Sequence, residues 1–274
     1  MPYITMTDKT KIYYEDKGEG ETLIFAHGLN SSHNANKDFH DEFKNFRIIT
    51  YDQRGHANSD KSTKHMTIKH LGQDLNEIIE NLNLNKITLI GHSMGAATIY
   101  SYINQFGCEK LKRIVASDMS PYMRNNEWKG GIGQGNWSDE DFLMDFDRIF
   151  DDVGKATFHI AKKLMNPELS NISNQMKETI IKNYNEEIDP FTMASLWFSL
   201  FKTDQRPAIK KINIPFLYIM PEKALYSMEA IDFIENNVQK EFILANSFPN
   251  TTHAIWREMP HEVANCIKKF INKY

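Results

Sequence analysis

Short apolar runs alternate with helical patterns along most of the chain. The runs that predict buried strands are bounded by turn residues and lie at 22–26, 47–51, 87–90, 111–116, 215–220 and 241–244. Between them apolar residues recur every three or four positions, as from Ile68 to Leu82 and from Val263 to Ile271, which predicts amphipathic helices. This alternation is typical of a parallel sheet that is covered by helices on both faces.

The N-terminal segments 4–6 and 11–14 flank the turn residues Asp8-Lys9-Thr10 and predict an antiparallel hairpin at the edge of the sheet. With this hairpin, the predicted sheet has eight strands and is mostly parallel.

One long stretch, from about Pro121 to about Arg206, contains no strand pattern. It holds four helical patterns, at 142–150, 156–165, 176–184 and 191–201. A helical insertion between two parallel strands would lie over the carboxyl ends of the strands, where ligands bind in open α/β sheets. We therefore predict a core made of residues 1–120 and 207–274, with a helical cap at 121–206.

The composition is that of an ordinary globular protein, with 274 residues of which 41% are hydrophobic and 25% charged. The net charge of −4 and the absence of a basic patch argue against a nucleic-acid partner. The sequence shows no signal peptide, and no apolar run approaches the roughly 18 residues that a membrane span needs. Cys108 and Cys266 are expected to be reduced, which fits the cytoplasm. No Cys/His spacing suggests a metal site.

The strongest chemical signal is Gly91-His92-Ser93-Met94-Gly95, which follows a predicted strand and precedes a predicted helix. A serine in this G-x-S-x-G context lies at a sharp turn that lifts its hydroxyl above the sheet. The flanking glycines avoid collisions with the neighbouring strand and helix, and the helix N-terminus places N–H groups near developing negative charge. We predict that Ser93 is a nucleophile.

Four segments in this order resemble the α/β-hydrolase superfamily over nearly the whole chain. They are His27-Gly28-Leu29, the stretch Asp52 to Asp60, the turn at Ser93, and His253 in a late loop. The likeness is greatest to small cytoplasmic capped esterases and lactonases. It implies the α/β-hydrolase fold and a Ser-acid-His triad in that chain order.

The resemblance implies that His253 is the general base, since it lies between the last strand and the last helix. An imidazole suits this role because it accepts and returns a proton near neutral pH. His27 is expected to bond within its own loop, and His92 to point away from the nucleophile without transferring protons. Asp52 and Arg54 are expected to tie their turn through a charge-assisted hydrogen bond.

The sequence departs from the family's usual pattern at the acid of the triad, because Ala224 occupies the position where the family most often has an aspartate. Asp118 ends the predicted strand 111–116, where some members of the superfamily carry the acid. Glu222 lies near the usual position on a longer side chain. We favour Asp118 and keep Glu222 as the alternative; the other interpretations are a turn cap for Asp118 and a solvated charge for Glu222.

The backbone N–H groups of Leu29 and Met94 are expected to form the oxyanion hole, one after the His27-Gly28 turn and one after the nucleophile. Together these residues predict a serine hydrolase that cleaves small carboxylic esters or lactones through an acyl-enzyme, without a metal or an organic cofactor. The alternatives are a carbon–carbon bond hydrolase or a thioesterase on the same triad, and a non-catalytic ligand-binding protein. We expect a small-molecule partner and neither nucleic acid nor membrane; the sequence carries no sign of the oligomeric state.

Overall fold

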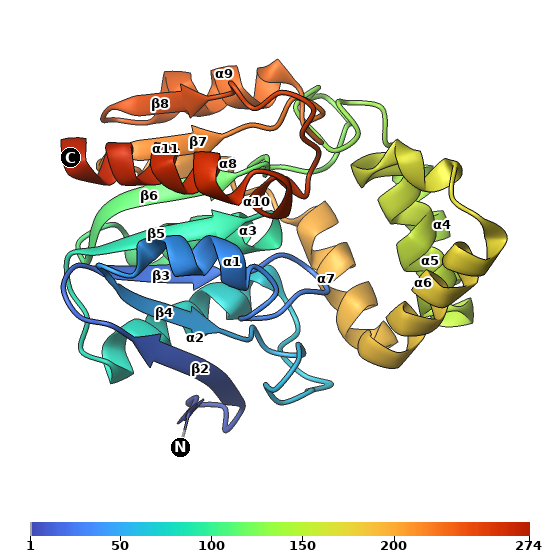
Figure 1. Ribbon diagram of the computed structural model, residues 1–274, viewed down its shortest axis with the longest axis horizontal. Helices are drawn as coiled ribbons and strands as arrows, with labels where there is room; N and C mark the ends of the chain where they lie inside the picture. Colours follow the sequence, from blue (N-terminus) through green and yellow to red (C-terminus); the bar gives the residue numbers. More distant parts are fainter. Residues whose placement is uncertain (1) are drawn as a thin grey trace.

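The computed structural model describes residues 2–274, and its centre is a sheet of eight strands (Figure 1). The strands are β1 (Tyr3–Thr5), β2 (Lys11–Lys17), β3 (Thr22–Ala26), β4 (Arg47–Tyr51), β5 (Ile87–His92), β6 (Leu111–Ser117), β7 (Phe216–Ile219) and β8 (Phe242–Ala245). Their order is β1-β2-β4-β3-β5-β6-β7-β8. Only the pairs β1/β2 and β2/β4 are antiparallel, and the others are parallel. The predicted hairpin and the mostly parallel eight-stranded sheet are therefore confirmed.

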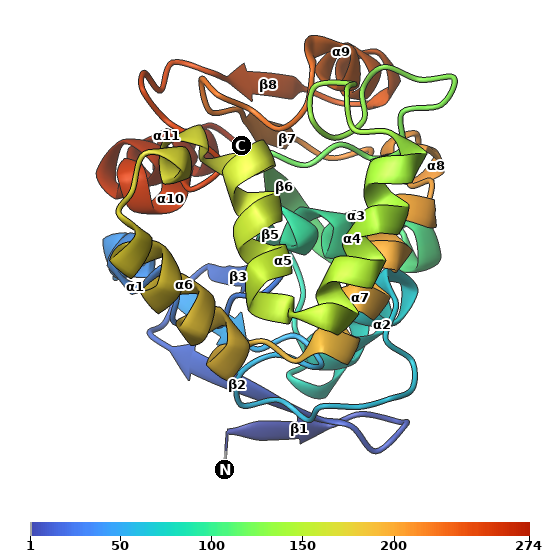
Figure 2. The same ribbon diagram turned by 90° about the vertical axis from the view of Figure 1, so that its right-hand side faces the viewer.

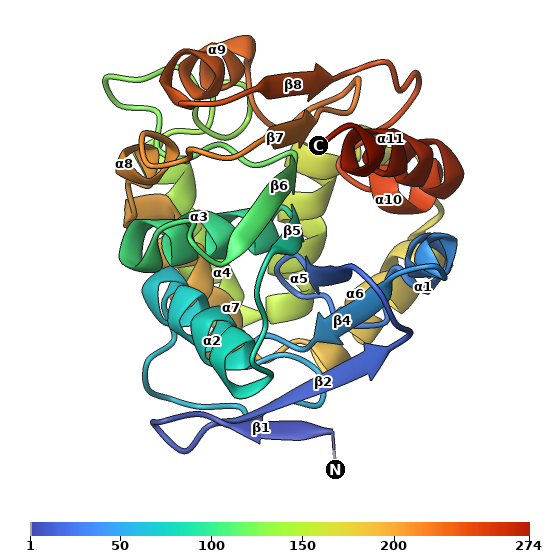
Figure 3. The same ribbon diagram turned by 90° about the vertical axis from the view of Figure 1, so that its left-hand side faces the viewer.

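Both faces of the sheet are covered, as the apolar runs predicted. Along β3, Ile24 and Ala26 pack on one face, and Leu23 and Phe25 on the other. The first face is covered by α2 (Ile68–Asn81), α3 (Met94–Phe106), α8 (Arg206–Ile209) and α9 (Met228–Asn237). The second is covered by α1 (Lys37–His40), α10 (Ile255–Glu258) and α11 (Pro260–Lys273) (Figure 3). β3 and β7 are almost entirely apolar because neither of their faces meets water, whereas the N-terminal hairpin strands β1 and β2 carry exposed residues.

Between β6 and β7, four helices of the described chain lie where four helical patterns were predicted. They are α4 (Asp139–Asp151), α5 (Val153–Ile160), α6 (Asn174–Glu187) and α7 (Pro190–Lys202). A capping box of Ser138 and Asp141 begins α4, and the Asp189 side chain caps α7. The four helices lie together beyond the carboxyl ends of the parallel strands (Figures 1 and 2). The division of the chain at residues 121 and 206 stays a prediction.

Gln205 joins the two ends of this insertion. Its backbone N–H donates to the carbonyl of Pro121 at 2.8 Å, and its side-chain amide donates to the carbonyl of Ala97 in α3 at 2.7 Å. The side chain is buried, so both bonds are shielded from water. The entry and the exit of the insertion are thus held together against the core.

The predicted bond between Asp52 and Arg54 is wrong. The buried Arg54 guanidinium instead donates to Asp74 of α2 at 2.6 Å and to Asp8 at 2.9 Å. Asp52 accepts from the backbone N–H groups of His33 and Asn58. Each buried charge is therefore satisfied by a more distant partner, which ties this turn to α2 and to the β1–β2 turn.

Within residues 2–274, no helix combines the length and the apolar character that crossing a membrane requires.

Candidate active site

Ser93 stands at the corner between β5 and α3 with φ 55° and ψ −125°, in a region that side-chain-bearing residues rarely adopt. The two glycines of the motif make this corner possible. A Cβ atom at Gly91 would lie 2.6 Å from the backbone N of Ala96, and one at Gly95 would lie 2.0 Å from the carbonyl oxygen of Ala26. The backbone N–H of Ser93 donates to Ser117 at the end of β6 at 2.9 Å, which fixes the corner to the neighbouring strand.

The structure brings Asp118 and His253 together. The Nδ1 atom of His253 lies 2.8 Å from Oδ2 of Asp118. Asp118 follows β6 directly and is completely buried, with a positive φ of 44°. The N–H of Leu225 donates to both of its carboxylate oxygens, at 3.1 and 3.2 Å. Asp118 is thus held between the late histidine loop and the segment after β7.

Glu222 has no such contact with His253 in the described chain. Its side chain is exposed, and its Oε2 atom accepts from the backbone N–H of Asn250 at 2.9 Å. The segment that contains Ala224 nevertheless takes part in the site, because it supplies the Leu225 N–H to Asp118.

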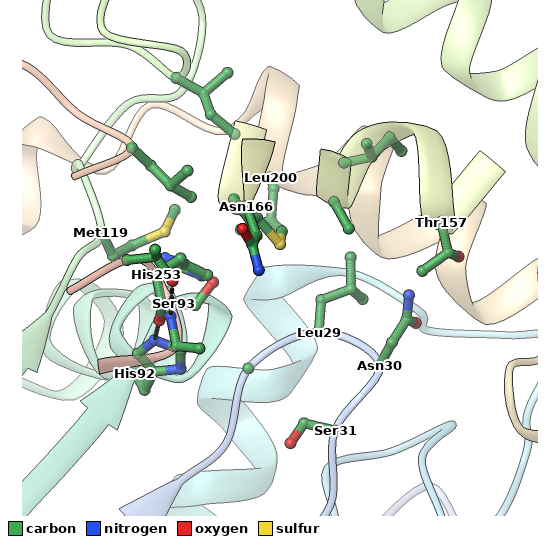
Figure 4. A pocket seen from close by; sticks show the side chains of 18 of the residues that line it. Leu29, Asn30, Ser31, His92, Ser93, Met119, Thr157, Asn166, Leu200 and His253 are labelled. Carbon is green, nitrogen blue, oxygen red and sulfur yellow. Dashed lines mark hydrogen bonds between the residues drawn. The ribbon is translucent and has the colours of Figure 1, made fainter. Parts of the chain in front are cut away.

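Ser93 and His253 lie side by side at the wall of a cavity of about 370 Å³ (Figure 4). Met119, next to Asp118, lies beside them, and Leu29 lies across the cavity. The apolar lining of the cavity comes largely from the insertion and includes Ile160, Ala161, Met165, Met193, Trp197 and Leu200. Trp197 of α7 lines this cavity, whereas the neighbouring Phe198 is exposed. The site therefore offers an enclosed, mostly apolar space next to the serine.

The loop with the predicted oxyanion donor passes close to Ser93. A Cβ atom on Gly28 would lie 3.3 Å from Cβ of Ser93, so a larger residue would crowd this serine. In residues 2–274, neither the Leu29 nor the Met94 backbone N–H donates to another protein group. Both N–H groups are available to a ligand.

Two buried histidines hold this loop against the turn after β4. His27 donates from Nδ1 to the Gly28 carbonyl at 2.7 Å and accepts from the Gln53 N–H at 2.9 Å. His56 contacts the Arg54 carbonyl through Nδ1 and accepts from the Asn30 N–H at 3.1 Å. Each ring therefore works as a neutral donor–acceptor pair, and the expectation that His27 bonds within its loop is confirmed.

These histidines predict a loss of stability in acid. Burial lowers the pKa of His27 to about 4 and that of His56 to about 3. The unfolded chain takes up these protons near pH 6.5, whereas the folded chain resists them. The free energy of unfolding is therefore expected to fall between pH 6.5 and 4, by about 1.4 kcal/mol per pH unit for each ring.

Urea unfolding at pH 7.5, 6 and 5 measures this slope. His56→Gln should make the slope shallower by about one proton, since comparison with the unsubstituted protein cancels the contributions of all other groups. An unchanged slope in that variant would contradict the assignment.

His92 supports the loop that carries His253, a role that the sequence analysis missed. Its Nε2 atom donates to the His253 carbonyl at 2.7 Å, and the two rings lie 4.6 Å apart between centroids. Burial, together with the nearby His253, lowers the pKa of His92 well below its usual range. A neutral ring that is bonded to a carbonyl suits a positioning role. The position directly before the nucleophile was the available signal.

Comparison with known proteins identifies the family of the chain. A family model described as alpha/beta hydrolase fold matches residues 21–223. Non-heme chloroperoxidase CPO-A1 of Kitasatospora aureofaciens is 30% identical over 126 residues, and this match covers 44% of the chain and 45% of that protein. Bifunctional esterase/perhydrolase DCH of Acinetobacter calcoaceticus is 24% identical over 81% of the chain and 82% of that protein.

Among solved structures, the esterase EaEST from Exiguobacterium antarcticum superposes with a TM-score of 0.83. Its sequence is 19% identical, and the alignment covers 98% of both chains. This likeness extends the shared fold over the insertion as well as the sheet. Since the family model spans well over half of the sequence, the chain belongs to the alpha/beta hydrolase family, whose fold agrees with the eight-stranded, mostly parallel sheet.

Proposed function

We propose that the protein is a serine hydrolase that cleaves small carboxylic esters or lactones through an acyl-enzyme. The observation that carries this proposal is the 2.8 Å contact between His253 and the buried Asp118, next to a serine at a strained corner. The relative that is named an esterase/perhydrolase supports the same chemistry.

In the proposed mechanism, the carboxylate of Asp118 accepts the Nδ1 proton of His253, which leaves Nε2 as the base. Nε2 takes the hydroxyl proton of Ser93 as the oxygen attacks the ester carbonyl. The resulting oxyanion would be bound by the N–H groups of Leu29 and Met94, each of which is typically worth about 3 kcal/mol of barrier lowering. His253 then returns the proton to the leaving alcohol, and water releases the acyl group by the same route.

The structure also bears on the rival functions. The non-catalytic alternative rested on Ala224, but Asp118 supplies a carboxylate to His253 in place of an acid at that position. A thioesterase or a carbon–carbon bond hydrolase would use the same residues, so the substrate decides between them. We further propose that residues 121–206 act as a cap, since they supply most of the apolar lining of the cavity.

The test combines a fluorophosphonate probe with a substrate panel. We expect one probe molecule to bind per chain, and p-nitrophenyl esters with short acyl chains to be hydrolysed faster than matched thioesters. Activity should decrease once the acyl chain outgrows the cavity. A folded protein that neither reacts with the probe nor cleaves any ester or lactone would favour the binding-protein alternative.

A further inference from the structure

The cavity beside Ser93 contains a single Lys, Arg, Asp or Glu side chain among the described residues that line it, and this is Arg257. The side chain is exposed, and within residues 2–274 it forms neither a hydrogen bond nor an ion pair with protein. In the described chain the adjacent Glu258 forms no ion pair with it, and its carboxylate accepts from the N–H and from the hydroxyl of Thr252, both at 2.7 Å. Among the described residues that line the cavity, Arg257 thus carries a positive charge without an ion-pair partner.

The fold fixes where this charge lies. Arg257 belongs to α10, which begins two residues after His253, and its backbone N–H donates to Ala254 at 2.8 Å. It also lines a second, outer hollow of about 230 Å³, which shares Asn36 and Trp256 with the first. The cavity beside Ser93 and this second hollow therefore adjoin at Arg257, and the exposed Asp38 also lines the second hollow.

The charge of Arg257 also acts on Tyr184 of α6, another residue that lines the cavity. Burial raises the pKa of its phenol, and the positive charge of Arg257 opposes that rise. Among the other residues that line the cavity, Asn30 and Asn36 carry side-chain amides that can donate to an anion.

We propose that Arg257 binds a carboxylate group of the substrate, so that the preferred esters or lactones are monoanionic. This inference rests on the proposed function and narrows its substrate class. A planar guanidinium pairs with a carboxylate through two parallel hydrogen bonds. The single guanidinium of Arg257 matches a single negative charge on the ligand. No acidic side chain among the described residues that line the cavity competes for this guanidinium.

Binding is tested first, in the Ser93→Ala background where turnover is blocked. The two ligands are monomethyl glutarate and the same ester with its carboxylate converted to a primary amide. We expect the carboxylate to bind about tenfold tighter by titration calorimetry, with the preference weakening at high salt because the guanidinium is exposed. Adding Arg257→Gln should bring the ratio of the two affinities close to one.

Lys69→Gln is the matched control, because it removes one positive charge from an exposed position on α2, across the sheet from α10. It should leave the carboxylate preference intact. Equal affinities in the parent background, or a preference that survives Arg257→Gln, would overturn the proposal.

Measurements of turnover distinguish a failure of this inference from a failure of the proposed function. The ratio of kcat/KM for the p-nitrophenyl monoester of glutarate to that for its amide analogue should be about ten and should approach one in Arg257→Gln. Ester cleavage without any preference in turnover or binding would refute the inference and leave the proposed function standing. A carboxylate preference in binding without cleavage of any ester would support the role of Arg257 and refute the proposed hydrolase function.

Discussion

Ser93→Ala is expected to reduce ester turnover by a factor on the order of 10⁵ to 10⁶, as loss of the serine does in other triads. Without the hydroxyl no acyl-enzyme can form, and only substrate binding and the backbone donors remain. The comparison uses kcat on p-nitrophenyl acetate and mass spectrometry of the fluorophosphonate-treated protein, where the peptide containing Ser93 should carry the added mass in the parent alone.

Ser31→Ala provides the control for this experiment, since Ser31 lines the same cavity but lies in the loop after β3. It should retain probe labelling at Ser93. Labelling or turnover of Ser93→Ala at more than a tenth of the parent level would show that another residue is the nucleophile.

Asp118→Asn is expected to lower kcat by about 10⁴-fold, whereas Glu222→Gln should change it by less than about twofold. An amide in place of the carboxylate can present a donor to Nδ1 of His253, which favours the wrong tautomer and leaves an imidazolium without its counter-charge. The asparagine oxygen can still accept from the Leu225 N–H, so the substitution preserves much of the local structure.

The two variants are compared by kcat at pH 7.5, with circular dichroism and Tm confirming that each is folded. Glu222→Gln matches the chemical change of Asp118→Asn, but at an exposed carboxylate whose partner is Asn250. A large effect of Glu222→Gln together with a small effect of Asp118→Asn would move the acid role to Glu222.

The architecture could be predicted because its signals are local. Apolar runs such as 22–26 mark strands that are buried on both faces, and the G-x-S-x-G motif marks a corner that few other residues can form. The helices of the insertion were equally visible, since they carry regular apolar spacing and side-chain caps. Each of these features depends on residues within about one element of one another.

The structure was needed to favour Asp118 over Glu222 as the proposed acid. β6 and β7 are adjacent parallel strands in which Ser117 pairs with Ile219, so Asp118 and Glu222 both follow strand ends at the same edge of the sheet. Their burial separates them, because Asp118 is enclosed and bonded to His253, 135 residues away, whereas Glu222 faces solvent. Contacts across such distances in the chain leave no pattern in a single sequence.

Contacts between residues that are distant in the chain also explain why the partner of Arg54 was predicted wrongly and why His92 and Arg257 were missed. Arg54 meets Asp74 through the docking of α2, and Arg257 lines the cavity only because α10 and the insertion come together there. His92 was visible beside the nucleophile, but its bond to the His253 carbonyl joins residues 161 positions apart.

The two hydrogen bonds of Gln205 make the geometry of the sheet independent of the chain inserted between β6 and β7. Because Pro121 and Gln205 are bonded to each other and Gln205 is bonded to α3, the adjoining strands β6 and β7 keep their register whatever chain runs between those two points. Lengthening a closed loop adds only slowly to its entropic cost, about 0.6 kcal/mol per doubling. The chain between Pro121 and Gln205 can therefore change in length and sequence while Ser93, Asp118 and His253 keep their places in the core.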